Sequence, residues 1–426
     1  MISITISRLL PILLACAVGA GEARAQLSPT AEVVYLRKDC TGVANCSTDL
    51  VALTNWIFST RHPSASSPLL MDIGPGDFQG PFLCKNGNGW VTLRGSGRGQ
   101  TRILSAPVGV MDFLESAVDI QLPGGCTNLE FQDMTLQGKR LGVYWQGAGV
   151  STWTNVDIVG GSVPRSFVEG AGIGWWDGGQ IGCGGETPPA DIPLHYFYNS
   201  NVRGLGGPMN IGFVVHCGEH WFFGGEITAI PEDPVSEGVL MNVGVQVQSW
   251  GRFHAFGTAI RARAGAATST SYAAPITGVE VQDKGMFHMH GGIIRADAVQ
   301  APWTAISVIG IDVKPGALQV HTPDTSFVVQ SALGGSARRL AGSGPAVQSP
   351  FLWPPSTLPP ASASLVEPEV QSVHASDLYV ESDCQESGAC DAGGGSEPHL
   401  MVYSESCSPS PWFDTVTGRC RNVTGP

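Results

Sequence analysis

The sequence predicts an all-β fold in which short parallel strands stack into a coil. Three stretches that start at Ile211, Val243 and Thr277 align with one another. Within them a glycine recurs after 33 and then 34 residues, at Gly224, Gly257 and Gly291. Apolar and polar residues alternate, which is the period of a strand and not the 3.6-residue period of a helix. A repeat of about this length is typical of stacked architectures.

The alternation also predicts which side chains point into the coil. One turn of the coil, or rung, cannot bury its apolar face alone, so neighbouring rungs share a continuous core. The residues expected to point inward are Val245, Val247, Val279 and Val281. Those expected to point outward are Gln246, Gln248, Glu280 and Gln282. A slip of one residue would reverse every assignment.

Residues 1–25 have the pattern of a signal peptide. Arg8 precedes an apolar run from Leu9 to Ala20, and Ala23-Arg24-Ala25 has the small residues of a cleavage site. Anchoring as a lipoprotein through Cys16 is the competing interpretation. Both predict a mature chain that is secreted, periplasmic or at the cell surface. The apolar run is too short to span a bilayer, and no later segment is typical of a transmembrane span.

The chain is acidic, with a formal net charge of −13. This charge argues against nucleic acid or an anionic membrane as the main partner. Only 14% of the residues are charged, and glycine is abundant at 56 residues. Both values suit an exported protein that is rich in strands and turns. The oligomeric state is left open.

The cysteines that follow the signal segment indicate disulfides, because their number is even in an exported chain. Pairing of sequence neighbours is the simplest of many connectivities. It would join Cys40 with Cys46, Cys84 with Cys126, Cys183 with Cys217, Cys384 with Cys390, and Cys407 with Cys420. No pair has the spacing of a zinc site, and the sequence indicates no cofactor.

The N-terminal segment predicts a cap followed by the first strands. Residues 49–57 form a short amphipathic pattern with Ser47 or Thr48 near its N-cap, which predicts a helix. A strand at 69–73 then leads to a Gly-Pro-Gly turn. Next comes a V-x-L-x-G-x-G-x-x-x-T-x-I segment that runs from Val91 to Ile103.

This order resembles the entry region of the pectate-lyase-like superfamily, which has the pectin lyase fold. Asp39 and Asp49 hold the positions of the aspartates in the family's first turn. The likeness covers roughly residues 33–330, and Val91–Ile103 is its most specific motif. It implies a right-handed, single-stranded parallel β-helix with an N-terminal capping helix. It identifies neither a specific family within the superfamily nor an activity.

The chain divides into five predicted parts. After the signal peptide at 1–25, residues 26–104 form the cap and first rungs, and residues 105–330 form the parallel β-helix. Residues 331–375 are rich in Pro, Ser and Ala and predict a linker. Residues 376–426 hold four cysteines and predict a small module stapled by disulfides.

Three columns of outward residues are candidates for binding. The first contains Gln146, Trp176, His216, Gln248 and Gln282. The second contains Tyr196, Trp221, His254 and His288, flanked by Tyr198, Phe223, Phe256 and His290. The third contains Arg203, Thr228, Arg261 and Arg295. Exposed aromatic rings suit sugar rings, whereas the plain alternative is that a loop covers them or that they belong to the core.

The arginines of the third column allow two interpretations. Like charges on adjacent strands are unfavourable unless acids or a bound anion compensate. Glu226 and Asp297 are positioned to compensate, which would make the column structural. Otherwise Arg203, Arg261 and Arg295 would contact an acidic polysaccharide, because guanidinium groups bind carboxylates and sulfates well.

Catalytic residues are not indicated. Glycoside hydrolysis needs two carboxylates within about 5–10 Å, and Asp177 and Asp283 would lie three rungs apart, at roughly 14 Å. The segments typical of polygalacturonase-, pectate-lyase- and pectin-esterase-like relatives are missing. His288 and His290 share a face, but no third metal ligand accompanies them. The sequence therefore favours a protein that binds a polysaccharide. If the protein is an enzyme, we expect a polysaccharide lyase or a glycoside hydrolase. A non-catalytic surface or adhesion protein is the alternative.

Overall fold

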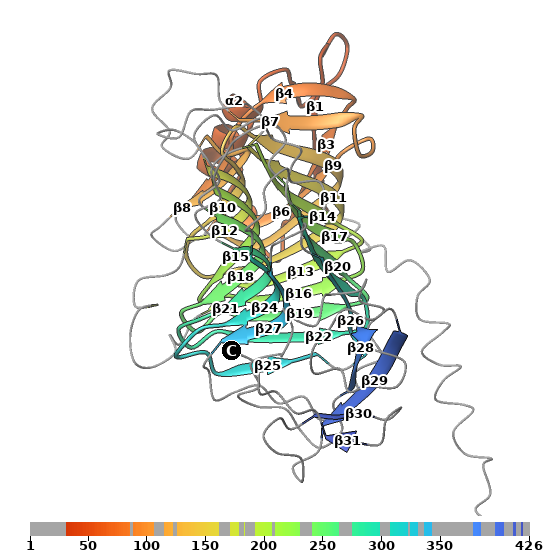
Figure 1. Ribbon diagram of the computed structural model, residues 1–426. Helices are drawn as coiled ribbons and strands as arrows, with labels where there is room; N and C mark the ends of the chain where they lie inside the picture. The colour runs from red at the N-terminus through yellow and green to blue at the C-terminus, as the bar shows by residue number, and fades with distance from the viewer. Residues whose placement is uncertain are drawn as a thin grey trace, which may run out of the picture.

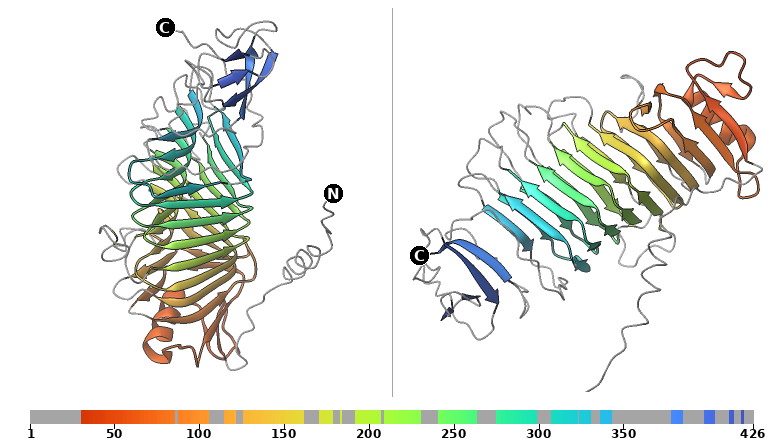
Figure 2. Two further views of the ribbon diagram at one scale, coloured as in Figure 1. Left: turned by 90° about the horizontal axis from the view of Figure 1, so that it is seen from below. Right: turned by 90° about the vertical axis from the view of Figure 1, so that its right-hand side faces the viewer.

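The computed structural model is a parallel β-helix, as the sequence predicts (Figure 1, Figure 2). It describes residues 31–85, 88–105, 115–121, 126–161, 171–178, 183, 192–206, 209–230, 241–263, 275–298, 307–322, 324–330 and 336–342. Four short C-terminal strands are also described, at 378–384, 397–403, 412–414 and 419–420. The predicted signal peptide lies outside the described residues.

Each central rung consists of three strands. One rung contains β15 (Met209–His216), β16 (Glu219–Phe223) and β17 (Glu226–Ile230). The next contains β18 (Met241–Gln248), β19 (Arg252–Phe256) and β20 (Ala259–Arg263), followed by β21 (Ile276–Val281), β22 (Met286–His290) and β23 (Ile293–Asp297). Ile211 pairs with Val243, and Val243 pairs with Thr277, so the three aligned stretches lie in register.

The coil therefore has three faces. The first face contains β12 (Ala171–Asp177), β15, β18, β21, β24 (Ser307–Val313) and β27 (Ser336–Gly342). The second contains β13 (Leu194–Tyr198), β16, β19, β22 and β25 (Gln319–His321). The third contains β14 (Asn201–Leu205), β17, β20, β23 and β26 (Ser326–Gln330). All these strands pair in parallel with their equivalents one rung away.

The N-terminal rungs are less regular. They comprise β1 (Glu32–Leu36), β2 (Cys46–Ser47), β3 (Leu69–Ile73), β4 (Gly76–Gln79), β5 (Phe82–Lys85), β6 (Gly89–Arg94), β7 (Thr101–Leu104), β8 (Val118–Gln121), β9 (Thr127–Gly138), β10 (Leu141–Trp145) and β11 (Val150–Gly160). The capping helix α2 (Leu50–Trp56) continues into the π-helical turn η1 (Ile57–Arg61). The N-cap is Asp49 and not Ser47 or Thr48, because the Asp49 side chain accepts a hydrogen bond from the Ala52 backbone.

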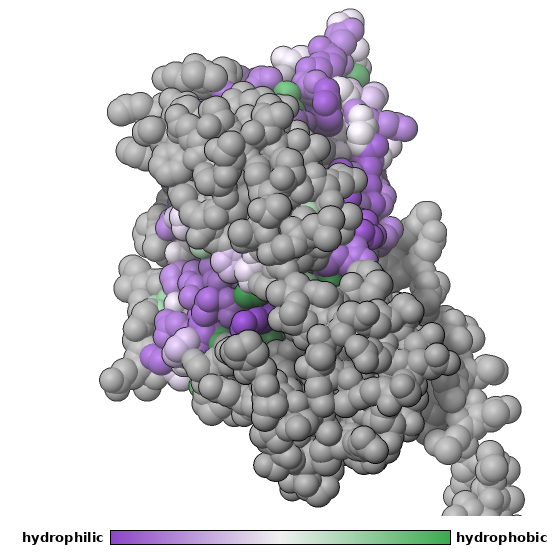
Figure 3. Space-filling model, in the orientation of Figure 1, coloured by the Kyte–Doolittle hydropathy of each residue, from purple (hydrophilic) through white to green (hydrophobic). Residues whose placement is uncertain are grey.

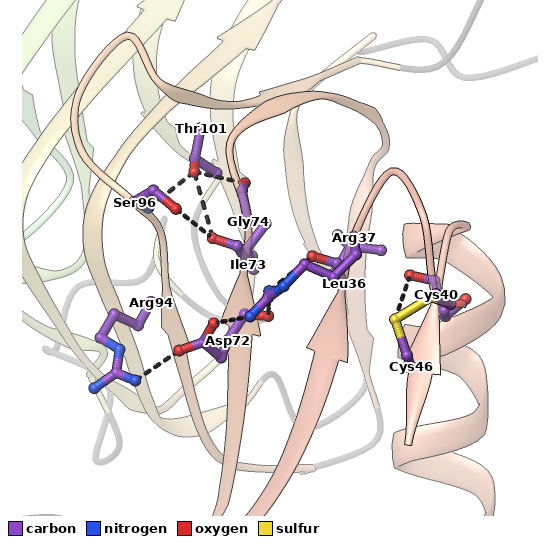
Figure 4. Close-up of polar contacts among 11 residues, drawn as sticks. Leu36, Arg37, Cys40, Cys46, Asp72, Ile73, Gly74, Arg94, Ser96 and Thr101 are labelled. Carbon is purple, nitrogen blue, oxygen red and sulfur yellow. Dashed lines mark hydrogen bonds and ion pairs between the residues drawn. A yellow bond between two sulfur atoms is a disulfide. The ribbon is translucent and has the colours of Figure 1, made fainter. Parts of the chain in front are cut away.

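The motif from Val91 to Ile103 builds the scaffold. Val91, Leu93, Thr101 and Ile103 are all buried. The Thr101 hydroxyl accepts a hydrogen bond from the Ser96 backbone at 2.9 Å and donates one to the Gly74 carbonyl at 2.8 Å (Figure 4). This one hydroxyl satisfies backbone groups of two neighbouring rungs, so the motif specifies a fold and not an activity.

A cluster of charges locks the first rungs together. Asp72 on β3 lies between Arg37 and Arg94, with nitrogen–oxygen distances of 2.5 and 2.6 Å (Figure 4). Partial burial acts to raise the pKa of Asp72, but the hydrogen bonds from Arg94 and Arg37 outweigh it and lower the pKa below its usual value. The carboxylate is therefore ionised and joins three segments of the cap.

Aromatic rings fill the centre of the coil. Phe131 stacks on Trp153 with centroids 4.0 Å apart, and Phe197 stacks on Phe222 at 4.2 Å. On the first face, the valines predicted to point inward are completely buried: Val245, Val247, Val279 and Val281. The inward assignment is thus confirmed for these four valines, whereas Gln246, which was expected to point outward, is buried.

The core also contains a polar group of side chains. The Ser151 hydroxyl lies 2.7 Å from Nδ1 of His195, and the ring of His220 on the next rung lies 4.7 Å from that of His195. Both histidines are completely buried. Burial lowers the pKa of His220 to about 3, and burial together with His220 lowers that of His195. Both rings are therefore neutral at physiological pH.

The C-terminal boundary of the coil differs from the prediction. Strand β27 pairs in parallel with β24, although its residues fall in the segment 331–375 that was expected to be a linker. The coil therefore continues at least to Gly342. Composition misled here because the strand is rich in small residues. Beyond it, β28 (Leu378–Cys384), β29 (Glu397–Tyr403), β30 (Trp412–Asp414) and β31 (Arg419–Cys420) form an antiparallel sheet.

Three disulfides join cysteines that are neighbours in the sequence. They are Cys40–Cys46, Cys84–Cys126 and Cys183–Cys217. The side chains of Cys384, Cys390, Cys407 and Cys420 lie outside the described residues. Within the described part of the chain, no helix is both long and apolar enough to cross a bilayer.

Candidate functional site

Two columns of rings run along the outer side of the second face. Tyr196, Trp221, His254 and His288 occupy successive strands in register, as predicted, and form the inner column. Two residues further along each strand lie Tyr198, Phe223, Phe256 and His290, which we call the outer ladder. Because residues i and i+2 of a strand point to the same side, both columns line one surface.

The inner column is closed by its own contacts. Trp221 stacks on His254 with centroids 4.0 Å apart and planes 13° apart, so the two rings cover each other. The Trp221 indole donates to Glu219 at 3.0 Å. His254 Nε2 lies 3.7 Å from the same carboxylate. Burial, followed by His288 and Arg252, lowers the pKa of His254 to about 4, so His254 is neutral near pH 7 and forms no ion pair there.

The outer ladder is more open. Successive centroids are separated by 5.1 Å from Tyr198 to Phe223, 5.3 Å from Phe223 to Phe256, and 5.2 Å from Phe256 to His290. The ring planes deviate from parallel by only 8–11°. Carbon atoms in contact are about 3.5–4.0 Å apart, which is less than these centroid separations. The parallel rings are therefore displaced sideways from one another, so each ring covers only part of the face of the next. Tyr198 is 41% exposed, and His290 is also exposed.

The arginine column lies on the third face, beyond the sharp bend that follows the outer ladder. Arg203, Thr228, Arg261 and Arg295 are in register, as predicted. Arg261 lies 3.4 Å from Glu226, and Arg295 lies 2.7 Å from Asp297. Acids of the chain itself therefore compensate two of these charges, which favours the structural interpretation for Arg261 and Arg295. Arg203 is exposed.

The first face holds Trp176 and His216, but not in one column. Trp176 pairs with Tyr144 on one side and with Val214 on the other. Val214 lies two positions before His216, and His216 pairs with Gln248. The prediction was wrong because two nearby glycines, at 172 and 174, fit the repeat equally well, and the second is the true match. Trp176 packs in an apolar cluster on this face, with Leu141, Ile173, Ile211, Val214 and Val243. Burial lowers the pKa of His216, which is half-buried.

A pair of carboxylates on the first face was missed by the sequence argument. Glu280 on β21 pairs directly with Asp312 on β24. Gln246 donates to Glu280 at 2.7 Å, and Lys314 lies 2.6 Å from Asp312. Hydrophilic residues gather at the lower left of Figure 3, where Figure 1 places β21 and β24, although Asp312 itself is buried. The three aligned stretches end at Ala298, before Asp312, so this pairing was not predicted.

The pair considered from the sequence does not form a site. Asp177 is completely buried, whereas Asp283 is exposed at a turn. Asp177 follows Trp176 and takes the inward position next to Trp175 and His220, with its carboxylate close to Gly218. The two carboxylates therefore do not share a surface.

No protein-family model matches the chain, and no curated protein matches it. Among solved structures it is similar to Escherichia coli YbhC, at 12% identity and a TM-score of 0.28. The similarity covers 70% of this chain and 75% of YbhC.

Proposed function

We propose that this protein binds a polysaccharide along the outer ladder of the second face. The observation that carries the proposal is the row of offset rings at Tyr198, Phe223, Phe256 and His290, spaced 5.1–5.3 Å apart. Partly uncovered ring faces suit the flat C–H faces of sugar rings, and the row runs along the coil axis. A long chain of repeating sugars matches a long row of repeating sites.

The predicted export of the chain supports this proposal. Extracellular and periplasmic proteins encounter polysaccharides, and disulfides such as Cys84–Cys126 suit an oxidising compartment. An acidic glycan is favoured over a neutral one, because exposed Arg203 lies on the strand that follows Tyr198 around the bend. Arg261 and Arg295 are already paired with Glu226 and Asp297, so the preference for an acidic glycan depends on Arg203.

The test compares binding to immobilised polygalacturonate, alginate and a neutral β-glucan. The double variant Phe223→Ala, Phe256→Ala should bind about 5- to 150-fold more weakly, because each lost aromatic contact costs about 0.5–1.5 kcal/mol. Trp176→Ala removes a ring from the first face and serves as the matched control. Equal binding by the double variant and the native chain would refute the proposal.

Cleavage of the glycan is a second candidate function, favoured by the pairing of Glu280 with Asp312. Glycosidases use two carboxylates on one surface as acid and base or nucleophile. Reducing ends released by the native chain should disappear with Glu280→Gln and with Asp312→Asn. If the native chain releases neither reducing ends nor unsaturated products from a broad polysaccharide panel, the non-catalytic surface or adhesion function is favoured instead.

A further inference from the structure

The C-terminal end of the ring surface gathers four histidines on three successive strands. His254, His288 and His321 pair in register on β19, β22 and β25. His290 lies two residues after His288 on the same strand and on the same face. The chain has ten histidines in all, so this concentration on one surface is out of proportion to the composition.

We propose that His288, His290 and His321 bind a divalent transition-metal ion such as Zn²⁺. Two histidines separated by one residue, with a third on the neighbouring strand, present three imidazoles on one surface. The third ligand missing from the sequence argument is His321, which lies directly opposite His288. Imidazole nitrogen is a preferred ligand of zinc and copper, and three histidines form a recognised type of zinc site with one open position.

The ring spacing suits one shared metal ion. Centroids lie 5.6 Å apart between His290 and His321, and 6.1 Å apart between His288 and His321. Two imidazoles on a tetrahedral zinc ion, with Zn–N bonds of about 2.0 Å, place their centroids about 5 Å apart. In the present arrangement, no three His, Cys, Asp or Glu side chains of the described residues could hold a metal ion. The rings must therefore turn to bind a metal ion, and His290, which is exposed, must leave its stack on Phe256 to do so.

His288 is oriented for this role. Its Nε2 is buried and has no hydrogen-bond partner among the described residues. The side chain of Gln319 hydrogen-bonds the same imidazole, which fixes the ring as outer-shell partners do at metal sites. A metal ion would satisfy the buried Nε2. The fourth position would remain open to water or to an oxygen ligand at the end of the outer ladder.

The experiment uses the full chain, freed of metal with a chelator and titrated with ZnCl₂ in a calorimeter. One ion should bind per chain. His290→Ala and His321→Ala should each weaken binding at least about 10-fold, since even outer-shell changes cost 10–100-fold. His216→Ala, on the first face, should have no effect. Substitution with Co²⁺ should give the intense visible absorption of tetrahedral coordination.

Because His290 is exposed, its replacement leaves the core intact and the result does not depend on misfolding. Zinc binding that is absent, that is unchanged by both variants, or that falls equally with His216→Ala would overturn the proposal. Glycan binding is measured separately in the presence of the chelator. A chain that binds glycan but not Zn²⁺ would disprove the metal site and leave the proposed function standing.

Discussion

The indole of Trp221 and the imidazole of His254 stack with their centroids 4.0 Å apart, so each ring hides one face of the other. Trp221→Ala should therefore act mainly on stability. Complete removal of a buried Trp costs about 3–5 kcal/mol. Because Trp221 is only partly buried, we expect the free energy of unfolding to fall by about 2 kcal/mol, as measured by urea denaturation.

Binding measurements separate the two ring columns. Trp221→Ala should reduce glycan affinity less than Phe256→Ala does. The reverse order would show that the inner column, and not the outer ladder, contacts the ligand.

Stability should decline with acid because of His220. Burial lowers its folded pKa to about 3, whereas the unfolded histidine has a pKa of about 6.5. Between these values the unfolded state binds a proton that the folded state does not. The free energy of unfolding should therefore fall as the pH decreases from 6.5 towards 3, by up to about 1.4 kcal/mol per pH unit.

The variant His220→Phe isolates this effect. The ring lies among Phe213, Phe197 and Trp175, so phenylalanine suits the site. The difference between the two stability profiles then reports His220 together with its effect on the neighbouring His195. A pH-independent difference would contradict the prediction.

The charge cluster of the cap offers a matched pair of substitutions. Asp72→Ala should lower the free energy of unfolding by about 1–3 kcal/mol, because it leaves Arg37 and Arg94 without their partly buried partner. Asp77→Ala breaks the pair with Arg102, whose side chain is 41% exposed. That loss should cost at most about 1 kcal/mol. Thermal unfolding of both variants, calibrated by denaturant titration, gives the comparison.

The disulfides should differ in their contribution to stability. Cys84–Cys126 closes a loop of 42 residues and Cys40–Cys46 a loop of six. Chain-entropy arguments give about 4 kcal/mol for the first and about 2 kcal/mol for the second. Unfolding of the two double Cys→Ala variants should show this order. A larger loss from the short loop would mean that native-state contacts, and not chain entropy, dominate.

Regular rungs were predictable and irregular ones were not. The stretch from Ile211 to Ala298 has glycine landmarks and clean alternation, so its register and its buried side were predicted residue by residue. The predicted position of Trp176 was wrong by two residues, because either Gly172 or Gly174 could be aligned with Gly212 of the next rung. His321 was missed because β25 has three residues and no glycine landmark.

The candidate site depends on contacts between outward side chains, which the alternation of apolar and polar residues does not predict. A pattern of period two identifies outward residues but not whether they cover one another. The closed Trp221–His254 stack and the open outer ladder both consist of outward rings in the same alternating pattern, so the sequence does not distinguish them. The pairing of Glu280 with Asp312 was likewise not predicted, since the aligned stretches end at Ala298 and Asp312 lies beyond them.

The matched register of successive rungs makes the length of this protein adjustable. Val243 and Thr277 are 34 residues apart and occupy equivalent positions on neighbouring strands. Excision of that interval would rejoin equivalent points, and duplication would insert one more copy of core and surface together. The number of rings on the second face is thus a variable that insertion or deletion can change in whole steps. The length of the ring surface would then follow the number of rungs.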